Sequence, residues 1–278
     1  MAVINTNIAS LNAQRNLNTS QTSLSTSMQR LSSGLRVNSA KDDSAGLAIA
    51  ERMSAQVRGM NVAIRNANDG VSLAQTAEGA LGKVGDSLQR MRELAVQARN
   101  STNSVDDKDS LDKEYQALAS EIGRVLGGTA FNGKTILGAD AGALDFQVGA
   151  NTTDDDLITV TTTDMTGDAT ITAVTGGTID NTADTAALKL VIDNIDTALD
   201  TVNSKRADFG AAQNRFDAVI SNLQVSVENQ SAARSRIMDA DFASETANLS
   251  RSQILQQAGT AMVAQANQLP QGVLALLR

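Results

Sequence analysis

Both ends of this chain carry apolar stripes at helical spacing, yet neither end contains a carboxylate. The charged side chains of residues 1–40 and 246–278 are five arginines: Arg15, Arg30, Arg36, Arg251 and Arg278. All 31 acidic residues therefore lie between residues 41 and 245. Because an unpaired carboxylate is costly to bury, this distribution predicts that both ends are buried against other helices. One chain offers little surface for that, so we expect further copies of the chain to supply the partners.

The middle of the chain carries most of the negative charge. Residues 138–200 contain twelve Asp and one Lys, a net charge of −11, whereas the whole chain has a net charge of −8. Phosphate binding depends on Lys and Arg, so an acidic middle disfavours nucleic acid as a partner. We expect this stretch to face solvent.

The sequence offers little for chemistry. It contains no Cys and no His, which removes thiol chemistry, the commonest general base and the commonest metal ligand. DDSAG at 42–46 and TTDDD at 152–156 lack the spacing of a calcium-binding loop, so a helix start and a solvated turn explain them better. We expect no catalytic, cofactor-binding or metal site and no membrane insertion, since no apolar run approaches 18 residues. The first residues also lack the features of a cleaved signal peptide.

Hydrophobic periodicity predicts a mainly α protein with a small β portion. A single Pro in 278 residues permits very long helices, and we expect one from about 44 to 99 and a heptad-patterned one from 185 to 237. Asp184 and Thr185 are a plausible N-cap for the latter. The stripes at the two ends predict coiled-coil packing and polymerisation, through Leu24, Met28, Leu31, Leu35, Leu255, Met262, Leu269 and Leu276.

The pattern changes to period two after residue 127, where glycines and β-branched residues accumulate. This predicts short strands near 134–137, 145–148, 157–161 and 170–174. The stretch 151–185 is rich in Thr, Asp and Gly, which is typical either of a small exposed β-excursion or of partial disorder.

Several long stretches resemble bacterial flagellin. They include RLSSGLRVNSAKDDSAGLAIA at 30–50, RNANDGVSLAQTAEGAL at 65–81, LQRMRELAVQA at 88–98, AARSRIMDADFASE at 232–245 and ILQQAGTAMVAQANQLPQGVLALLR at 254–278. The resemblance covers most of 1–150 and 186–278 and leaves out 151–185.

The resemblance implies a subunit of the flagellar filament, with long antiparallel helices, coiled-coil packing of the two terminal segments, β-hairpins and a short exposed insert. Residues 1–43 and 240–278 would form the inner core of the filament, residues 44–150 and 186–239 a helical rod domain with a β-hairpin, and residues 151–185 a short variable surface insert. Two alternatives remain: a hook–filament junction protein of the same superfamily, and a flagellin whose insert is adhesive or enzymatic.

The resemblance also implies partners and recognition sites. The protein would be exported without a cleaved signal to the outside of the cell, and its partners would be an export chaperone, the hook-associated and cap proteins, and other copies of itself. Arg90, Leu94 and Glu114 match residues that Toll-like receptor 5 contacts. The terminal Leu274, Leu276, Leu277 and Arg278 match the end that NAIP inflammasome sensors recognise, and docking in the filament core is their other role.

Overall fold

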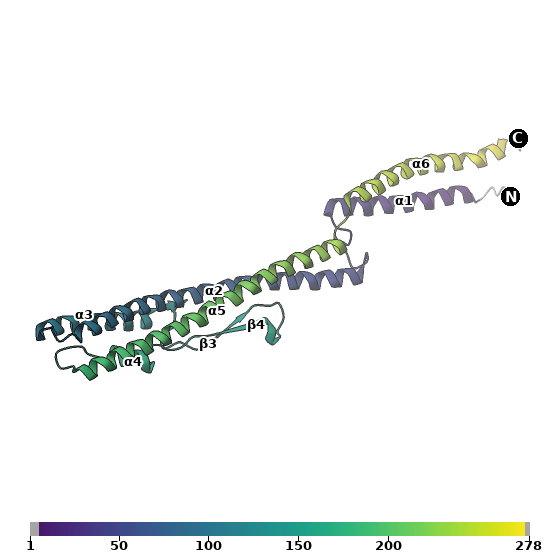
Figure 1. Cartoon of the computed structure of the whole chain (residues 1–278). Helices are drawn as coiled ribbons and strands as arrows, with labels where there is room; N and C mark the ends of the chain where they lie inside the picture. Colours follow the sequence, from purple (N-terminus) through teal and green to yellow (C-terminus); the bar gives the residue numbers. More distant parts are fainter. Residues whose placement is uncertain (1–5, 276–278) are drawn as a thin grey trace. The chain divides into compact units, whose positions relative to one another are not determined.

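The computed structural model describes residues 6–275, with side chains for residues 6–268. Two compact units are present: a terminal unit formed by the segments up to residue 55 and from residue 228 onwards, and a central unit of residues 56–227. The helices drawn in Figure 1 are α1 (Ile8–Ser33), α2 (Ser44–Ala98), α3 (Val105–Gly128), α4 (Ala169–Thr175), α5 (Thr185–Met238) and α6 (Phe242–Ala275). The strands are β1 (Ala130–Phe131), β2 (Lys134–Thr135), β3 (Ala143–Gln147) and β4 (Leu157–Thr161).

Polar side chains cap the helix starts, where four backbone N–H groups lack intrahelical partners. Asn7 accepts from the N–H of Ser10 at 3.0 Å at the start of α1. Asp184 accepts from the N–H of Ala187 at 2.7 Å, which confirms the predicted N-cap of α5. Gly34 ends α1 in the left-handed conformation, with φ of 72°. Capping side chains and a left-handed glycine therefore account for these helix ends.

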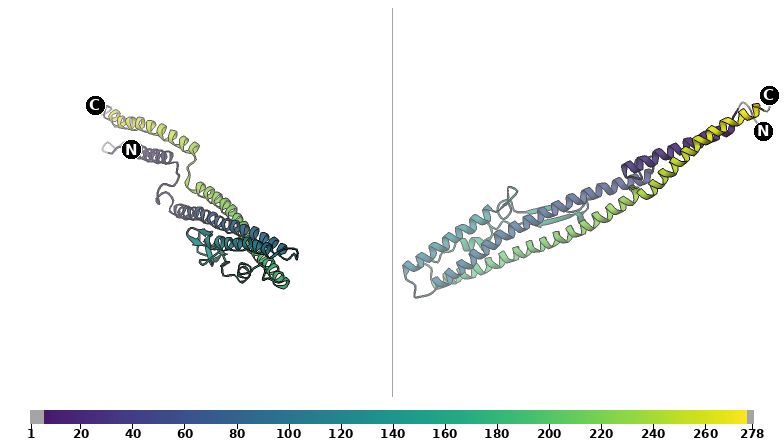
Figure 2. Two further views of the ribbon diagram at one scale, coloured as in Figure 1. Left: turned by 90° about the vertical axis from the view of Figure 1, so that its left-hand side faces the viewer. Right: turned by 90° about the horizontal axis from the view of Figure 1, so that it is seen from above.

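The core of the central unit lies between α2, α3 and α5. In Figure 1, α2 and α5 run side by side, and the view from above in Figure 2 agrees. The heptad of α5 faces this core, because five residues seven apart are at most 3% exposed: Leu188, Ile195, Val202, Phe209 and Phe216. Phe216 also meets the ring of Phe146 edge-on, with centroids 5.5 Å apart. The predicted heptad packing is confirmed here.

Two antiparallel hairpins follow α3. β1 and β2 are joined by Asn132 and Gly133, whose φ values of 48° and 81° suit a two-residue hairpin turn. β3 pairs with β4, with residues 143 and 147 opposite 161 and 157. Ile158 and Val160 are both 5% exposed, and alternate along β4 with exposed residues, as a strand with one buried face requires. β4 has the bounds that the sequence predicted.

The strand predicted at 170–174 is wrong, because these residues form the helix α4. Asp168 accepts from the N–H of Thr170 at 2.8 Å, which provides an N-cap. Ile171 and Val174 lie three residues apart and are at most 2% exposed, so helical burial overrides the β propensity of Thr, Ile and Val.

The segment 151–185 combines an exposed surface with buried anchors. Met165 and Ile179 are fully buried in the core of the central unit. The hydroxyl of Tyr115 on α3 donates to the carbonyl of Val174 at 2.9 Å, and Asp112 accepts from the N–H of Ile179 at 2.8 Å. The segment is thus ordered and contributes to the core as well as to the surface.

Candidate assembly interface

α1 and α6 form an antiparallel pair in the terminal unit. The views of Figures 1 and 2 agree that the two helices lie side by side. The Asn7 amide donates to the carbonyl of Ala266 at 2.7 Å, and the Ser10 hydroxyl donates to Asn267 Oδ1 at 2.7 Å. Near the other end of the pair, Glu245 contacts α1. The predicted pairing of the two terminal segments is confirmed for the described residues.

The seam between α1 and α6 has heptad spacing but is built mainly from small and polar residues. Buried or half-buried positions recur at alternating steps of three and four along both helices. On α1 they are Ser10, Ala13, Leu17, Ser20, Leu24, Ser27 and Leu31. On α6 they are Glu245, Leu249, Ser252, Gln256, Gly259, Val263 and Ala266. A methyl group added at Gly259 would lie 3.2 Å from Leu17 Cδ1, so the two helices approach closely there.

Large apolar side chains of the same two helices face outward. Seven of them are between 50% and 66% exposed: Ile8, Leu11, Met28, Phe242, Ile254, Leu255 and Met262. The pair therefore buries serines and a carboxylate beside the leucines of its seam, while it leaves other leucine, isoleucine, methionine and phenylalanine side chains exposed. An exposed apolar surface of this kind marks a site for contact with another protein.

The structure places the residues of the predicted polymerisation stripe on different faces of the pair. Leu24 and Leu31 lie in the seam, whereas Met28, Leu255 and Met262 point away from it. Leu35 lies beyond the end of α1, where it pairs with Asp239 in a β-bridge and packs in a small cluster around Val37, Ala50 and Met238. Leu269 and Leu276 lie outside the residues whose side chains are described.

Two grooves run along the pair. The first, of ≈ 380 Å³, is lined on α1 by Ala9, Ala13 and Leu17 among others, and on α6 by Leu255, Gly259 and Met262 among others. The second, of ≈ 420 Å³, adjoins it at Ser20 and Leu255 and is mostly polar. The apolar groove and the exposed Leu255 and Met262 thus form one continuous surface.

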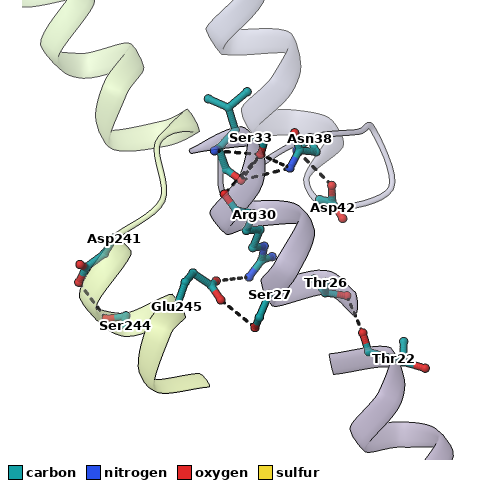
Figure 3. A network of polar contacts seen from close by, with 11 residues as sticks. Thr22, Thr26, Ser27, Arg30, Ser33, Asn38, Asp42, Asp241, Ser244 and Glu245 are labelled. Carbon is teal, nitrogen blue, oxygen red and sulfur yellow. Dashed lines mark hydrogen bonds and ion pairs between the residues drawn. The ribbon is translucent and has the colours of Figure 1, made fainter. Parts of the chain in front are cut away.

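A polar cluster lines part of the polar groove. In Figure 3, Glu245 of α6 reaches between Ser27 and Arg30 of α1. The Ser27 hydroxyl donates to one carboxylate oxygen at 2.9 Å, and the Arg30 guanidinium donates to the other at 3.0 Å. Glu245 as a whole is 7% exposed. The sequence does not predict this burial, because residue 245 is only the edge of the acidic region.

The three residues matched to receptor contacts lie on α2 and α3 of the central unit. Arg90 Nε donates to Glu114 at 2.8 Å, and Arg90 Nη1 donates to Glu93 at 2.9 Å. The side chains of Arg90, Glu93 and Glu114 are about half exposed or more. These hydrogen bonds, first that to Glu114 and then that to Glu93, raise the pKa of Arg90 above its ordinary value. Leu94 is only 1% exposed. Arg90 and Glu114 therefore share a surface, and Leu94 lies in the core beneath it.

The remaining predicted site residues cannot be placed. The side chain of Leu274 lies outside the described ones, and residues 276–278, which include Leu277 and Arg278, lie outside the described residues altogether. Within the described part of the chain there is no group of three or more acidic side chains arranged to hold a metal ion. Across the same residues, no helix is both long enough and apolar enough to span a membrane.

Sequence comparison finds relatives along nearly the whole chain. The profile described as the bacterial flagellin N-terminal helical region matches residues 4–141, and that of the C-terminal helical region matches residues 192–277. The chain is 46% identical to a flagellin of Halalkalibacterium halodurans over 276 residues, which are 99% of this chain and 100% of the relative. It is 43% identical to a flagellin of Bacillus subtilis over 304 residues, 99% of each chain.

Solved structures agree with this. The crystal structure of Bacillus cereus flagellin has a TM-score of 0.50 and 35% identity, and the match covers 61% of this chain and 94% of that one. A putative flagellar hook-associated protein from Vibrio parahaemolyticus has a TM-score of 0.62 with 13% identity, over 71% of this chain and 100% of that one. At that identity the second likeness shows the fold alone.

Proposed function

Since the chain belongs to the bacterial flagellin family and is a structural subunit of the flagellar filament that drives swimming, we propose that its copies polymerise through the pair of α1 and α6. The observation that carries this proposal is the pattern of the pair, in which small or polar residues occupy most of the seam while seven large apolar side chains face outward. Water is a poor environment for such an outer face, and neighbouring copies would cover it.

The occupant of the apolar groove is a second copy of the same pair. Leu255 and Met262 line the groove and are also exposed, so they can pack against a neighbour while the groove receives that neighbour's side chains. Such head-to-tail contacts do not close on themselves and therefore build a filament. The helices α1 and α6 contain one carboxylate side chain, Glu245, and it is paired with Arg30, so no free negative charge on these two helices opposes this packing.

Truncation tests the proposal directly. Removal of residues 1–40 or 246–278 should abolish filaments seen by electron microscopy. The central unit has its own core and should keep its helical circular dichroism and its cooperative unfolding. If either truncated chain still forms filaments, the terminal pair is not the polymerisation element.

The same proposal says where the protein acts and which proteins it contacts. Flagellins form a filament outside the cell, so we expect this chain to be exported with the help of a chaperone and to join hook-associated and cap proteins. The hook–filament junction alternative has less support, because the hook-associated likeness is 13% identical while full-length flagellins are 43% to 46% identical. Flagellins are structural proteins, and we expect no enzymatic activity.

Recognition by Toll-like receptor 5 is the second part of the proposal. Arg90 and Glu114 are exposed, hydrogen-bonded to each other and located on the LQRMRELAVQA segment and the helix beside it. The buried Leu94 would act by holding α2 in place rather than by direct contact.

The test replaces Arg90 or Glu114 with Ala and measures the dose–response of a receptor reporter. Arg124→Ala is a matched control, because Arg124 also forms an exposed ion pair, with Glu121 on α3. A weaker response for the first two variants and an unchanged one for the control would support this site. An unchanged dose–response for Arg90→Ala would remove it.

Recognition by NAIP sensors through Leu274, Leu276, Leu277 and Arg278 remains a proposal based on the terminal run VLALLR. Leu277→Ala in the full chain should reduce inflammasome activation after delivery of the protein to the cytosol. Equal activation by the variant would argue against that role.

A further inference from the structure

Glu245 is a buried charge in the seam between α1 and α6. It is the single carboxylate of α1 and α6, and its side chain is 9% exposed. A buried charge is costly unless it is paired and hydrogen-bonded, and Glu245 meets both requirements through Arg30 and Ser27. A leucine here would avoid the cost of burying a charge, so stability alone does not explain the residue.

The rest of the seam selects a register only weakly. Its residues repeat every seven positions as small or leucine side chains: Ser10, Leu17, Leu24 and Leu31 along one line of α1, and Ser252, Gly259 and Ala266 along one line of α6. A shift by one heptad therefore places similar side chains opposite one another along these two lines, whereas the second line of α6 changes in character along Leu249, Gln256 and Val263. At the far end of the pair, such a shift would exchange Asn267 for Thr260 opposite Ser10, and both can hydrogen-bond a serine.

The Glu245 cluster does not tolerate the same shift. A slip by seven residues in one direction places Ser20 and Ser23 where Ser27 and Arg30 stand, so the carboxylate would be buried without a cation. A slip in the other direction places Glu245 opposite Gly34, beyond the end of α1. Leaving one partner of a buried ion pair uncompensated is strongly destabilising. A polar residue at one heptad position is an established way to fix the register of paired helices.

We propose that Glu245, through Ser27 and Arg30, sets the register of α1 on α6 and thereby determines which assembly face the subunit presents. A heptad slip moves one helix by about 10 Å along the other, since each residue rises 1.5 Å. That slip would displace Met28 and Leu11 of α1 relative to Leu255 and Met262 of α6, and so disrupt the exposed apolar surface that these residues form together. Glu245 is a positioning residue, and the proposal rests on polymerisation through this pair.

The test measures register directly by chemical cross-linking. Because the chain has no Cys, a Ser10→Cys, Asn267→Cys chain reports the native register with a short bismaleimide, and a Ser10→Cys, Thr260→Cys chain reports the slipped one. Glu245→Leu is introduced into each full-length chain. The expected result is loss of the native cross-link, appearance of the slipped one, retained helix content, and loss of filaments.

Two further variants separate register from simple stabilisation. Glu245→Gln keeps one oxygen that accepts from Arg30, and its amide N–H can donate to the Ser27 hydroxyl, so it should keep the native cross-link. The exchange Arg30→Glu with Glu245→Arg should restore both the native cross-link and polymerisation, while either single change should not.

Two outcomes would overturn the inference. Glu245→Leu could keep the native cross-link and polymerise normally, in which case packing alone sets the register. It could instead lose both cross-links together with terminal helix, in which case Glu245 holds the pair together without choosing its alignment. Cross-linking is scored on soluble chains as well as on filaments, so a failure of polymerisation through the pair is recognised separately.

Discussion

The exposed apolar residues Leu255 and Met262 of α6 provide a direct test of assembly through the pair of α1 and α6. Complete burial of a leucine or methionine side chain stabilises by about 1.5–3 kcal/mol. Leu255 is 50% exposed and Met262 is 61% exposed, so about half of that free energy remains to be gained when a neighbour covers them. We therefore assign roughly 1 kcal/mol to each side chain on assembly.

The double variant Leu255→Ser, Met262→Ser should lose roughly 2 kcal/mol for every subunit added, which corresponds to about a 30-fold rise in the critical concentration for polymerisation, since 1.4 kcal/mol is tenfold. The assay is sedimentation of filaments across a series of subunit concentrations. Unfolding of the central unit by urea should not change, because both residues lie in the terminal unit.

A matched control lies on the same helix. Gln253 and Gln257 are exposed and point to the side of α6 opposite Leu255, since successive residues turn by about 100°. Serine at these two positions should leave the critical concentration close to that of the unchanged chain. A critical concentration for the Leu255 and Met262 variant equal to that of the control would refute the assignment of this face to subunit contacts.

Further predictions concern the central unit. Phe216→Ala should lower its free energy of unfolding by about 3–5 kcal/mol, measured by urea denaturation, because the ring is fully buried against Phe146. Gly70→Ala should cost about 1–3 kcal/mol in the same assay, since the added methyl would lie 2.5 Å from the Phe216 ring. The Ser104 hydroxyl and then its backbone N–H hold the pKa of Asp107 below its ordinary value. A carboxyl group whose pKa is lower in the folded state gives stability above its unfolded-state pKa, and this stability is lost as pH falls through the folded-state pKa. The first turn of α3 should therefore lose amide exchange protection below about pH 4. Asp107→Asn should show no such loss.

The long helices could be predicted because local rules decide them. The helix expected from 44 to 99 is α2, Ser44–Ala98, and the N-cap at Asp184 was visible as a residue type in the right place. The heptad of α5 was equally clear, since large apolar residues repeat there without interruption. Periodicity and capping are local properties, and one sequence suffices to recognise them.

The α4 prediction failed because β propensity was weighed above burial. Four of the five residues from Thr170 to Val174 are β-branched, but the three-residue spacing of Ile171 and Val174 and the capping Asp168 together favour a helix. Those signals were present in the sequence, and the Gly- and Asp-rich surroundings outweighed them.

The seam of the terminal pair was harder to predict. The sequence predicts polymerisation stripes that include Leu255 and Met262, and these two residues face outward, whereas Ser252, Gly259 and Ala266 form the seam within the chain. Both lines repeat every seven residues, so periodicity cannot say which of them faces the partner inside the chain. The pairing of Glu245 with Arg30 joins residues 215 apart in sequence, and no local rule connects them.

The anchoring of the 151–185 segment matters for the use of this chain as a display scaffold. A foreign epitope that replaced the whole segment would remove Met165 and Ile179 from the core and the hydrogen bonds that reach them from α3. An epitope inserted at the exposed loop tip 151–153 would leave both anchors in place. Exposed loop tips tolerate inserted sequence best, so residues 151–153 are a better graft point than the full segment.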